Sequence, residues 1–207
     1  RVLFRSGRSW IPKLINEISL KPFSLNFIFG PRQVGKTTLL KLLIRKLLID
    51  ENINPKRIFY FRCDLLSDYK ELNDVIKTYL EFRDSEGINS SFIFLDEITY
   101  PKEWYRTIKF HIDSGNFKND VLILTGSLSM YLKKEVELFP GRRGFGKDYI
   151  MLPLSFREFI EVFSPELSKE IPTLENLDKE EIFQKIYSIL PYAEEINKLF
   201  KLYLKIG

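Results

Sequence analysis

One stretch of the sequence has the residue types and spacing of a phosphate-binding loop. The run Gly30-Pro-Arg-Gln-Val-Gly-Lys-Thr37 fits the pattern G-x-x-x-x-G-K-[ST], whose glycines let backbone N–H groups fold around a phosphate. In this pattern Lys36 reaches the β- and γ-phosphates of a nucleotide, and the Thr37 hydroxyl binds Mg²⁺. A plain glycine-rich turn before a helix is the weaker alternative. We expect the following residues to contact a nucleotide: Gly30, Pro31, Arg32, Gln33, Val34, Gly35, Lys36, Thr37 and Thr38.

Two adjacent carboxylates follow the apolar run Phe92–Leu95. The run predicts a buried strand that ends at Asp96, and ligands of open α/β sheets bind where such strands end. We expect Asp96 to hold Mg²⁺ through its waters, and Glu97 to position and deprotonate an attacking water. Alone, an apolar run followed by acids is also typical of a strand that leaves for solvent. Together with the phosphate loop, the pair predicts a metal-dependent hydrolytic site.

A third apolar run, Val121–Leu124, ends in the small polar residues Thr125-Gly-Ser127. A hydroxyl at the tip of this strand could hydrogen-bond the γ-phosphate or the water beside Glu97. We expect Thr125 to do so and rank Ser127 second. The alternative is that the three residues only form a turn.

A basic glycine-rich loop, Gly141-Arg-Arg-Gly-Phe-Gly-Lys147, precedes the last predicted strand. Arg142 and Arg143 could supply an arginine finger to the γ-phosphate of their own or a neighbouring subunit. They could instead grip a nucleic-acid backbone, or the loop could simply be solvated. The arginine finger is the favoured of these three interpretations.

The elements that would position these residues alternate between strand and helix. Short apolar runs separated by helices of ten to fifteen residues are typical of βαβ units, and therefore of an α/β fold with a parallel sheet flanked by helices. The predicted strands are residues 25–29, 58–62, 91–95, 121–124 and 149–152, and the predicted helices between them are 37–49, 69–82 and 101–112.

The pattern becomes purely helical after the last predicted strand, and three segments follow from this. Residues 1–19 form an N-terminal segment. Within it, Val2–Ser6 resembles a sequencing scar, and residues 1–8 are not expected to be native. Residues 20–165 form the α/β core. Residues 166–207 form a helical region, broken at Pro191, which we expect to be truncated because apolar residues still recur at its end.

Composition narrows the class of protein. With 44% hydrophobic and 29% charged residues the chain is typical of a globular protein, and no apolar run is long enough to span a membrane, so we expect a cytoplasmic protein. The single cysteine, Cys63, and the single histidine, His111, exclude a zinc site of the usual type, so a metal would be bound by oxygen. We expect Cys63 to be a small core residue, His111 to be a surface or packing residue, and Lys36 to face solvent. The net charge of +4 is spread along the chain, which supports nucleic-acid binding only weakly.

These motifs, in this order, resemble the additional-strand class of P-loop ATPases, specifically AAA+. The runs Leu124–Ser127, Pro140–Arg143 and Leu152–Phe159 are similar to a predicted AAA+-type ATPase family of archaea and bacteria, over about residues 10–165. The resemblance implies binding and hydrolysis of ATP with Mg²⁺, with Asp96 and Glu97 as the Walker B pair.

The same resemblance implies a homo-oligomer and a carboxyl-terminal domain that is largely missing here. The partner on which the ATPase acts therefore cannot be named from the sequence. Two alternatives remain open: a nucleotide-dependent switch with negligible turnover, and, ranked last, a phosphotransferase.

Overall fold

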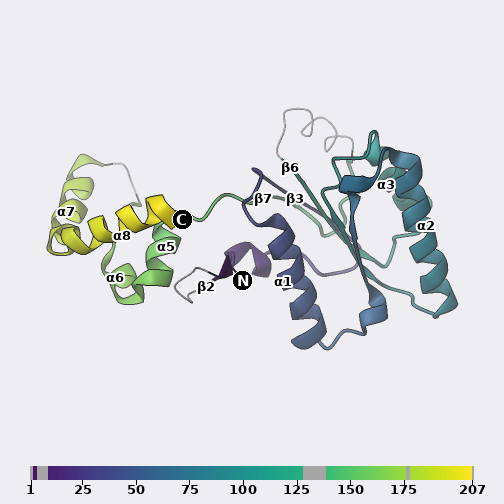
Figure 1. Cartoon of the computed structure of the whole chain (residues 1–207), viewed down its shortest axis with the longest axis horizontal. Coiled ribbons are helices and arrows are strands. Elements are labelled where there is room, and N and C mark those ends of the chain that lie inside the picture. The colour runs from purple at the N-terminus through teal and green to yellow at the C-terminus, as the bar shows by residue number, and fades with distance from the viewer. Residues whose placement is uncertain (1, 4–8, 128–138, 176–177, 207) are drawn as a thin grey trace. The chain divides into compact units, whose positions relative to one another are not determined.

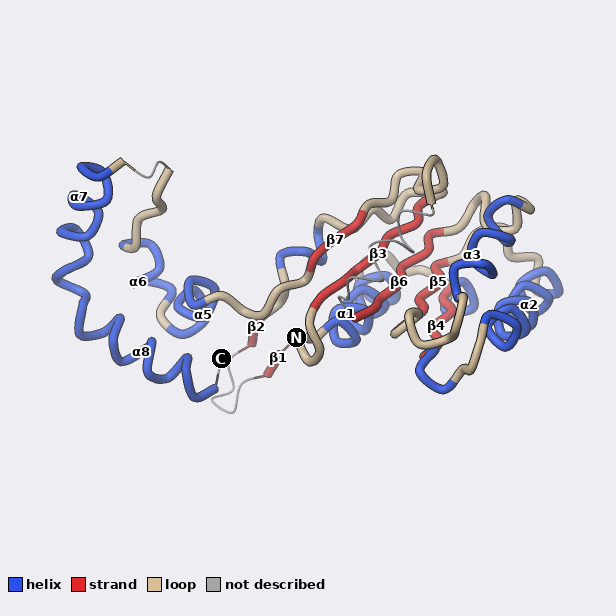
Figure 2. The backbone as a smooth tube through the Cα atoms, turned by 90° about the horizontal axis from the view of Figure 1, so that it is seen from above, coloured by secondary structure: helices blue, strands red, loops and turns tan. Residues whose placement is uncertain are grey.

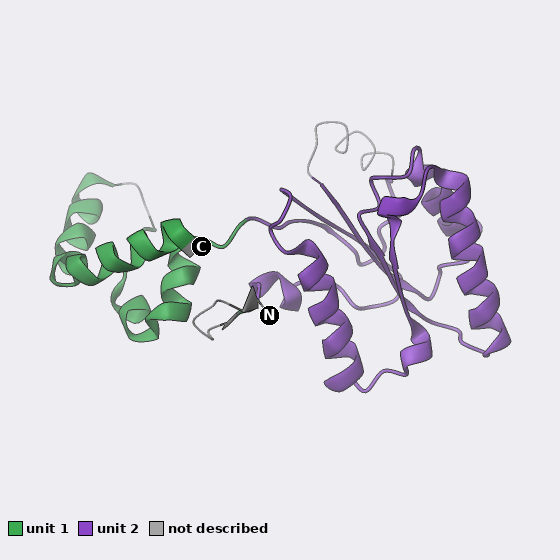
Figure 3. Ribbon diagram, in the orientation of Figure 1, with its two compact units in different colours: residues 1–10, 153–207 green, residues 11–152 purple. Residues whose placement is uncertain are grey.

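A computed structural model describes residues 2–3, 9–127, 139–175 and 178–206. Most of the suspected non-native residues 1–8 therefore lie outside the described part of the chain. The contacts divide the chain into two compact units, one of residues 11–152 and the other of residues 1–10 with 153–207 (Figure 3). No described helix is long and apolar enough to cross a membrane.

The larger unit is built on a five-stranded sheet in the order β4-β5-β6-β3-β7, which can be followed in Figure 2. Its strands, all parallel to their neighbours, are β3 (Ser24–Gly30), β4 (Ile58–Arg62), β5 (Phe92–Asp96), β6 (Val121–Ser127) and β7 (Asp148–Ile150). Because the strands are parallel, Gly30, Asp96 and Ser127 end at the same edge of the sheet. The sequence prediction of a parallel α/β sheet is confirmed.

Helices cover both faces of this sheet (Figure 1). Helix α1 (Lys36–Ile49) lies on one face, whereas α2 (Tyr69–Ser85) and α3 (Trp104–Asp113) pack together on the other. The sequence sets these boundaries locally, since Asp68 caps α2 by accepting hydrogen bonds from the N–H groups of Lys70 and Glu71. Short 3-10 turns complete the unit: η1 (Lys13–Asn16), η2 (Pro55–Arg57) and η3 (Cys63–Leu65).

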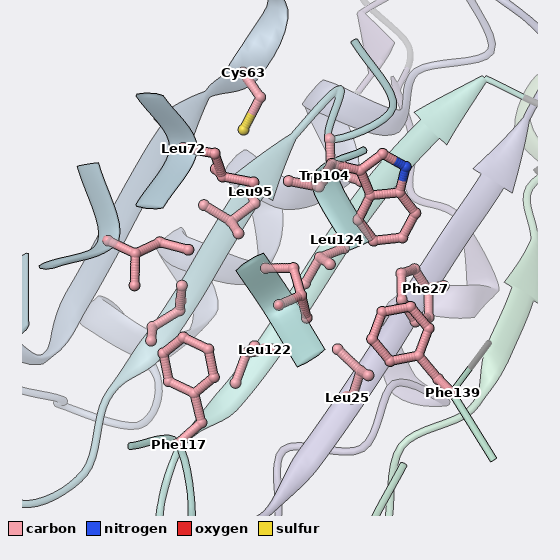
Figure 4. Packing of buried hydrophobic residues seen from close by; sticks show 14 of the residues in the cluster. Leu25, Phe27, Cys63, Leu72, Leu95, Trp104, Phe117, Leu122, Leu124 and Phe139 are labelled. Atoms are coloured by element: carbon pink, nitrogen blue, oxygen red, sulfur yellow. The ribbon is translucent and has the colours of Figure 1, made fainter. Parts of the chain in front are cut away.

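The core on the α2–α3 face is rich in aromatic side chains (Figure 4). Phe27 of β3 packs on Trp104 and Phe139, with ring centroids 5.7 and 5.5 Å away. Cys63 is fully buried at the edge of this core, as the sequence predicted. His111 is buried as well and hydrogen-bonds the side chains of Asn73 and Asn116. Cys63 is thus the core residue that was expected, and His111 takes the packing role rather than the surface position.

The smaller unit is mainly helical. It contains β1 (Val2–Leu3) paired with β2 (Ser9–Trp10), and the helices α5 (Phe156–Phe163), α6 (Pro165–Glu170), α7 (Lys179–Ile189) and α8 (Ala193–Ile206), with the 3-10 turn η4 (Leu190–Tyr192) before α8. A capping box between Ser155 and Glu158 starts α5. The break predicted at Pro191 is present, because the proline lies in η4.

The larger unit ends at Leu152, whereas the boundary expected from the sequence is near Pro165. The two boundaries differ because helix α5 belongs to the smaller unit. Its aromatic face packs against α8, where Phe156 meets Phe200 and Phe159 meets Tyr203 at centroid distances of 5.1 and 5.3 Å. The functional division into residues 20–165 and 166–207 stays a prediction.

Candidate nucleotide site

The predicted phosphate loop joins β3 to α1 at the carboxyl edge of the sheet. Gly35 has φ 96° and Gln33 has φ 65°, so the loop passes twice through the left-handed region. A Cβ on Gly30 would lie 2.2 Å from the carbonyl oxygen of Met151, which only glycine avoids. The spacing of the glycines therefore follows from the geometry of the loop.

The amino-terminal end of α1 is open to an anion. The helix has no side-chain cap and no acidic residue in its first turn. The first N–H groups of a helix lack intrahelical partners and carry partial positive charge, so they favour a phosphate. Pro31, Arg32 and Gln33 are exposed on the loop before this end.

Lys36 is buried, with 4% of its surface exposed, so the expectation that it faces solvent is wrong. Its ammonium donates hydrogen bonds to the carbonyl oxygens of Gly30 and Pro31, at 3.1 and 2.9 Å. The loop wraps around its own lysine, and the Nζ atom lies 4.0 Å from Oε1 of Glu97. This places the cation between the phosphate loop and the second carboxylate of the pair.

Asp96 is fully buried and accepts hydrogen bonds from three hydroxyl groups. Thr37 and Tyr60 donate to Oδ2 at 2.7 and 3.1 Å, and Thr125 donates to Oδ1 at 2.5 Å. Because Thr37 gives its proton to Asp96, the lone pairs of its oxygen remain available to a cation. The donor set of hydroxyl and carboxylate oxygens suits Mg²⁺.

A magnesium ion at Thr37 and Asp96 would take its other ligands from water and phosphate, as this cation commonly does. In the described part of the chain no three His, Cys, Asp or Glu side chains gather into a metal cluster. The residues present therefore fit Mg²⁺ bound with a nucleotide.

Glu97 is held by its backbone while part of its carboxylate stays unpaired. Its φ of 55° is left-handed, and its N–H donates to the Thr125 hydroxyl at 3.0 Å. Oε2 is buried, and among the described residues no hydrogen-bond partner contacts it. A buried acceptor without a partner fits a water molecule or a group that the bound substrate would supply.

The hydroxyls at the tip of β6 lie in two different places. Thr125 is fully buried and joins Asp96 to the backbone of Glu97, so its hydroxyl contacts both members of the pair. Ser127 pairs in register with Gly30, beside the start of the phosphate loop, and is partly exposed. A contact of either hydroxyl with the γ-phosphate stays a prediction.

The two arginines of the basic loop are not brought to the phosphate loop of the same chain. The backbone oxygen of Arg143 accepts a hydrogen bond from the Leu25 N–H, near the start of β3. Gly30 lies five residues further along that strand, about 16 Å away. A finger acting on the chain's own nucleotide does not fit this distance, while action on a neighbouring subunit stays a prediction.

Both arginines have partners where they lie. Arg142 binds the Asp113 carboxylate at 2.7 and 3.1 Å, which holds the pKa of Asp113 below its usual value. Arg143 pairs with Asp148 at 2.6 Å, and its guanidinium lies 4.4 Å from the centroid of the Phe27 ring.

Tyr60 is the site residue that the sequence analysis missed. Burial, followed by the charge of Asp96, raises its pKa to about 12, and the same two causes raise the pKa of Cys63 to about 12. Tyr60 therefore keeps its proton at neutral pH and remains a donor to Asp96. The sequence does contain a tyrosine on the neighbouring strand β4. Its contact with Asp96 can be inferred only once the register of β4 and β5 is known.

Together, the sheet order, the loop before α1 and the carboxylate pair define a P-loop NTPase fold of the additional-strand class. In this order β6 lies between the phosphate-loop strand and the carboxylate strand. Residues 22–160 match the sequence model of the family AAA_14, described as an AAA domain. The chain belongs to this family, as the resemblance seen in its motifs implied.

One curated relative is the uncharacterized protein MJ1544 of Methanocaldococcus jannaschii, 31% identical over 173 residues. The match covers 80% of this chain and 35% of that protein, so the chain spans about a third of the relative's length. Similar solved structures include the ORC2 protein of Aeropyrum pernix with ADPNP and ADP (14% identity, TM-score 0.49, 80% of this chain and 50% of that one). Another is the CDC6P protein of Pyrobaculum aerophilum (12% identity, TM-score 0.47, 70% of this chain and 42% of that one).

Proposed function

We propose that the protein binds ATP with Mg²⁺ and hydrolyses it to ADP and phosphate, using the energy on a partner that is still unidentified. The observation that carries the proposal is the buried, unpaired Oε2 of Glu97, the residue directly after Asp96. The other carboxylate oxygen of Glu97, Oε1, lies 4.0 Å from the ammonium of the loop lysine. Assembly into a homo-oligomer and a cytoplasmic location belong to the same proposal. Contact with nucleic acid is its least supported part.

In this proposal the phosphate loop binds the phosphates through its N–H groups and the amino-terminal end of α1. Lys36 exchanges its loop carbonyl partners for phosphate oxygens, which places its charge against the β- and γ-phosphates. Thr37 and Asp96 hold Mg²⁺, which supplies charge neutralisation on the phosphates when bound.

Glu97 then acts as the general base. Its Oε2 accepts a proton from a water molecule as the water oxygen bonds to the γ-phosphorus. The bond from this phosphorus to the β,γ-bridging oxygen breaks, and ADP leaves with that oxygen. Thr125 fixes the positions of Asp96 and Glu97 relative to each other, because its hydroxyl donates to the Asp96 carboxylate and accepts a hydrogen bond from the Glu97 N–H.

The alternative is a nucleotide-dependent switch with negligible turnover. The position of Lys36 favours this alternative. Its ammonium donates hydrogen bonds to the carbonyl oxygens of the phosphate loop and lies near the carboxylate of Glu97. Nucleotide binding alone would move this ammonium and so change the surroundings of Glu97, without any hydrolysis.

The substitution Glu97→Gln separates the two functions, because it keeps the size of the side chain and removes the base. An ATPase should lose steady-state phosphate release about 100-fold or more while it retains ATP binding. Glu103→Gln is the matched control, since Glu103 is exposed at the start of α3 and pairs with Arg106. If the unmodified protein releases no phosphate, alone or with candidate partners, the switch replaces the ATPase.

A further inference from the structure

Tyr60 contacts Asp96, the proposed metal-binding aspartate, although it belongs to none of the motifs predicted from the sequence. It lies on β4, the strand at the edge of the sheet, which pairs in parallel with the carboxylate strand β5. The register aligns Arg62 with Asp96, so Tyr60 is two residues before the partner of Asp96 and points to the same face of the sheet. Its hydroxyl spans this offset and donates to Oδ2 of Asp96 at 3.1 Å.

The oxygen that Tyr60 contacts is the one that faces the metal ligand Thr37. Thr37 donates to the same Oδ2 at 2.7 Å, while Thr125 engages the other oxygen, Oδ1. The Thr37 hydroxyl must remain able to bind a cation, and the Thr125 hydroxyl also accepts a hydrogen bond from the Glu97 N–H. The hydroxyl of Tyr60 has one contact among the described residues, to Oδ2, and neither of these other tasks falls to it, so its contribution to the site is to orient Oδ2.

The strand that carries Tyr60 is anchored on its opposite face. Phe59, the preceding residue, stacks on Tyr79 of α2 with ring centroids 4.3 Å apart and an interplanar angle of 13°. This stack holds the edge strand against α2, so the backbone that carries the Tyr60 side chain is fixed in place. A donor on a rigid element can orient a carboxylate more narrowly than one on a loop.

We propose that Tyr60 is a positioning residue for Mg²⁺, which aims Oδ2 of Asp96 at the metal bound beside Thr37. The inference rests on the proposed nucleotide function and adds to it a residue on β4. Rotation about the last bond of an aspartate is broad and soft, so a lost donor lets the carboxylate sample orientations that do not suit the metal. Binding of the nucleotide without metal does not involve this oxygen and should be unaffected.

The test compares the unmodified protein with Tyr60→Phe, using methylanthraniloyl-ATP as a fluorescent probe. Its affinity is measured in EDTA and then at increasing MgCl₂. We expect affinity in EDTA to stay within about twofold, and the Mg²⁺ concentration for half-maximal effect to rise about tenfold to 100-fold, as for one lost hydrogen bond to a charged group. Tyr79→Phe is the control, because it removes a phenol hydroxyl on the α2 side of the same strand.

Three results would overturn the inference, and they differ from one another. An unchanged or lower Mg²⁺ requirement in Tyr60→Phe, with Mg²⁺-dependent binding by the unmodified protein, removes the positioning role alone. An equal rise in Tyr79→Phe, or a lowered melting temperature with no change in Mg²⁺ requirement, assigns Tyr60 a structural role instead. No binding of the probe by the unmodified protein removes the proposed function and this inference with it.

Discussion

Replacing Thr125 by valine should destabilise the fold as well as the site. The hydroxyl is fully buried and makes two hydrogen bonds, donating to Asp96 Oδ1 at 2.5 Å and accepting from the Glu97 N–H at 3.0 Å. Valine has nearly the same volume, so the change leaves no cavity. It leaves a buried carboxylate oxygen and a backbone N–H without partners.

Each buried polar group left without a partner costs about 1–3 kcal/mol, so the two groups that Thr125→Val leaves unpaired should lower the free energy of unfolding by about 2–6 kcal/mol. This is a large part of the roughly 5–15 kcal/mol typical of a domain. Thr125→Ser keeps the hydroxyl and loses one buried methyl group, at a cost of about 1 kcal/mol.

Urea unfolding monitored by circular dichroism measures both variants against the unmodified protein. Ser127→Ala is the control at the same strand tip, because Ser127 is partly exposed. If Thr125→Val unfolds within about 1 kcal/mol of Thr125→Ser, the two hydrogen bonds do not hold the carboxylates, and the reasoning about the site fails.

Two further predictions concern a buried histidine and the basic loop. Burial, and secondarily the charge of Lys77, lowers the pKa of His111 from 6.5 to about 4, so the unfolded chain takes up this proton first as the pH falls. Stability should therefore be full above pH 6.5 and drop by about 3 kcal/mol by pH 4. Urea unfolding at several pH values should show this drop, and a His111→Gln variant with the same pH slope would contradict it. For the loop, an Arg142→Ala/Arg143→Ala chain mixed with a Glu97→Gln chain should regain phosphate release if the arginines act on a neighbouring subunit, since some sites then hold an intact glutamate and intact arginines. Activity no higher than the sum of the two variants, in a confirmed mixed oligomer, would contradict action between subunits.

The parts of the fold that were predictable are those with local signals. The strand at Ile58–Arg62 is found as predicted, and α1 begins one residue before the predicted start, because apolar periodicity and glycine spacing act over a few residues. The neighbouring positions of the phosphate loop and Asp96 also follow from a simple rule, since parallel strands end at one edge of the sheet.

Features that depend on register or on tertiary packing were not predictable. The contact of Tyr60 with Asp96 requires the alignment of two strands that the sequence does not specify. The burial of Lys36 arises because the loop closes over its own lysine.

The position of the basic loop could have been predicted. A loop that precedes a strand of a parallel sheet lies at the amino-terminal edge, and nucleotides bind at the opposite edge. Arg143 beside Leu25 is the observed result.

The central claim is that the loop before α1 binds the phosphates of a nucleotide, and calorimetric titration with Mg-ATP tests it most directly. Lys36→Ala removes the ammonium that the loop encloses, and Lys41→Ala removes an exposed lysine of the same helix as a matched control. Circular dichroism spectra of both variants are compared with that of the unmodified protein as the control for folding. The account predicts that Lys41→Ala binds like the unmodified protein and that Lys36→Ala binds about 100-fold more weakly or not measurably. Equal affinity of the Lys36→Ala variant and the unmodified protein would contradict it.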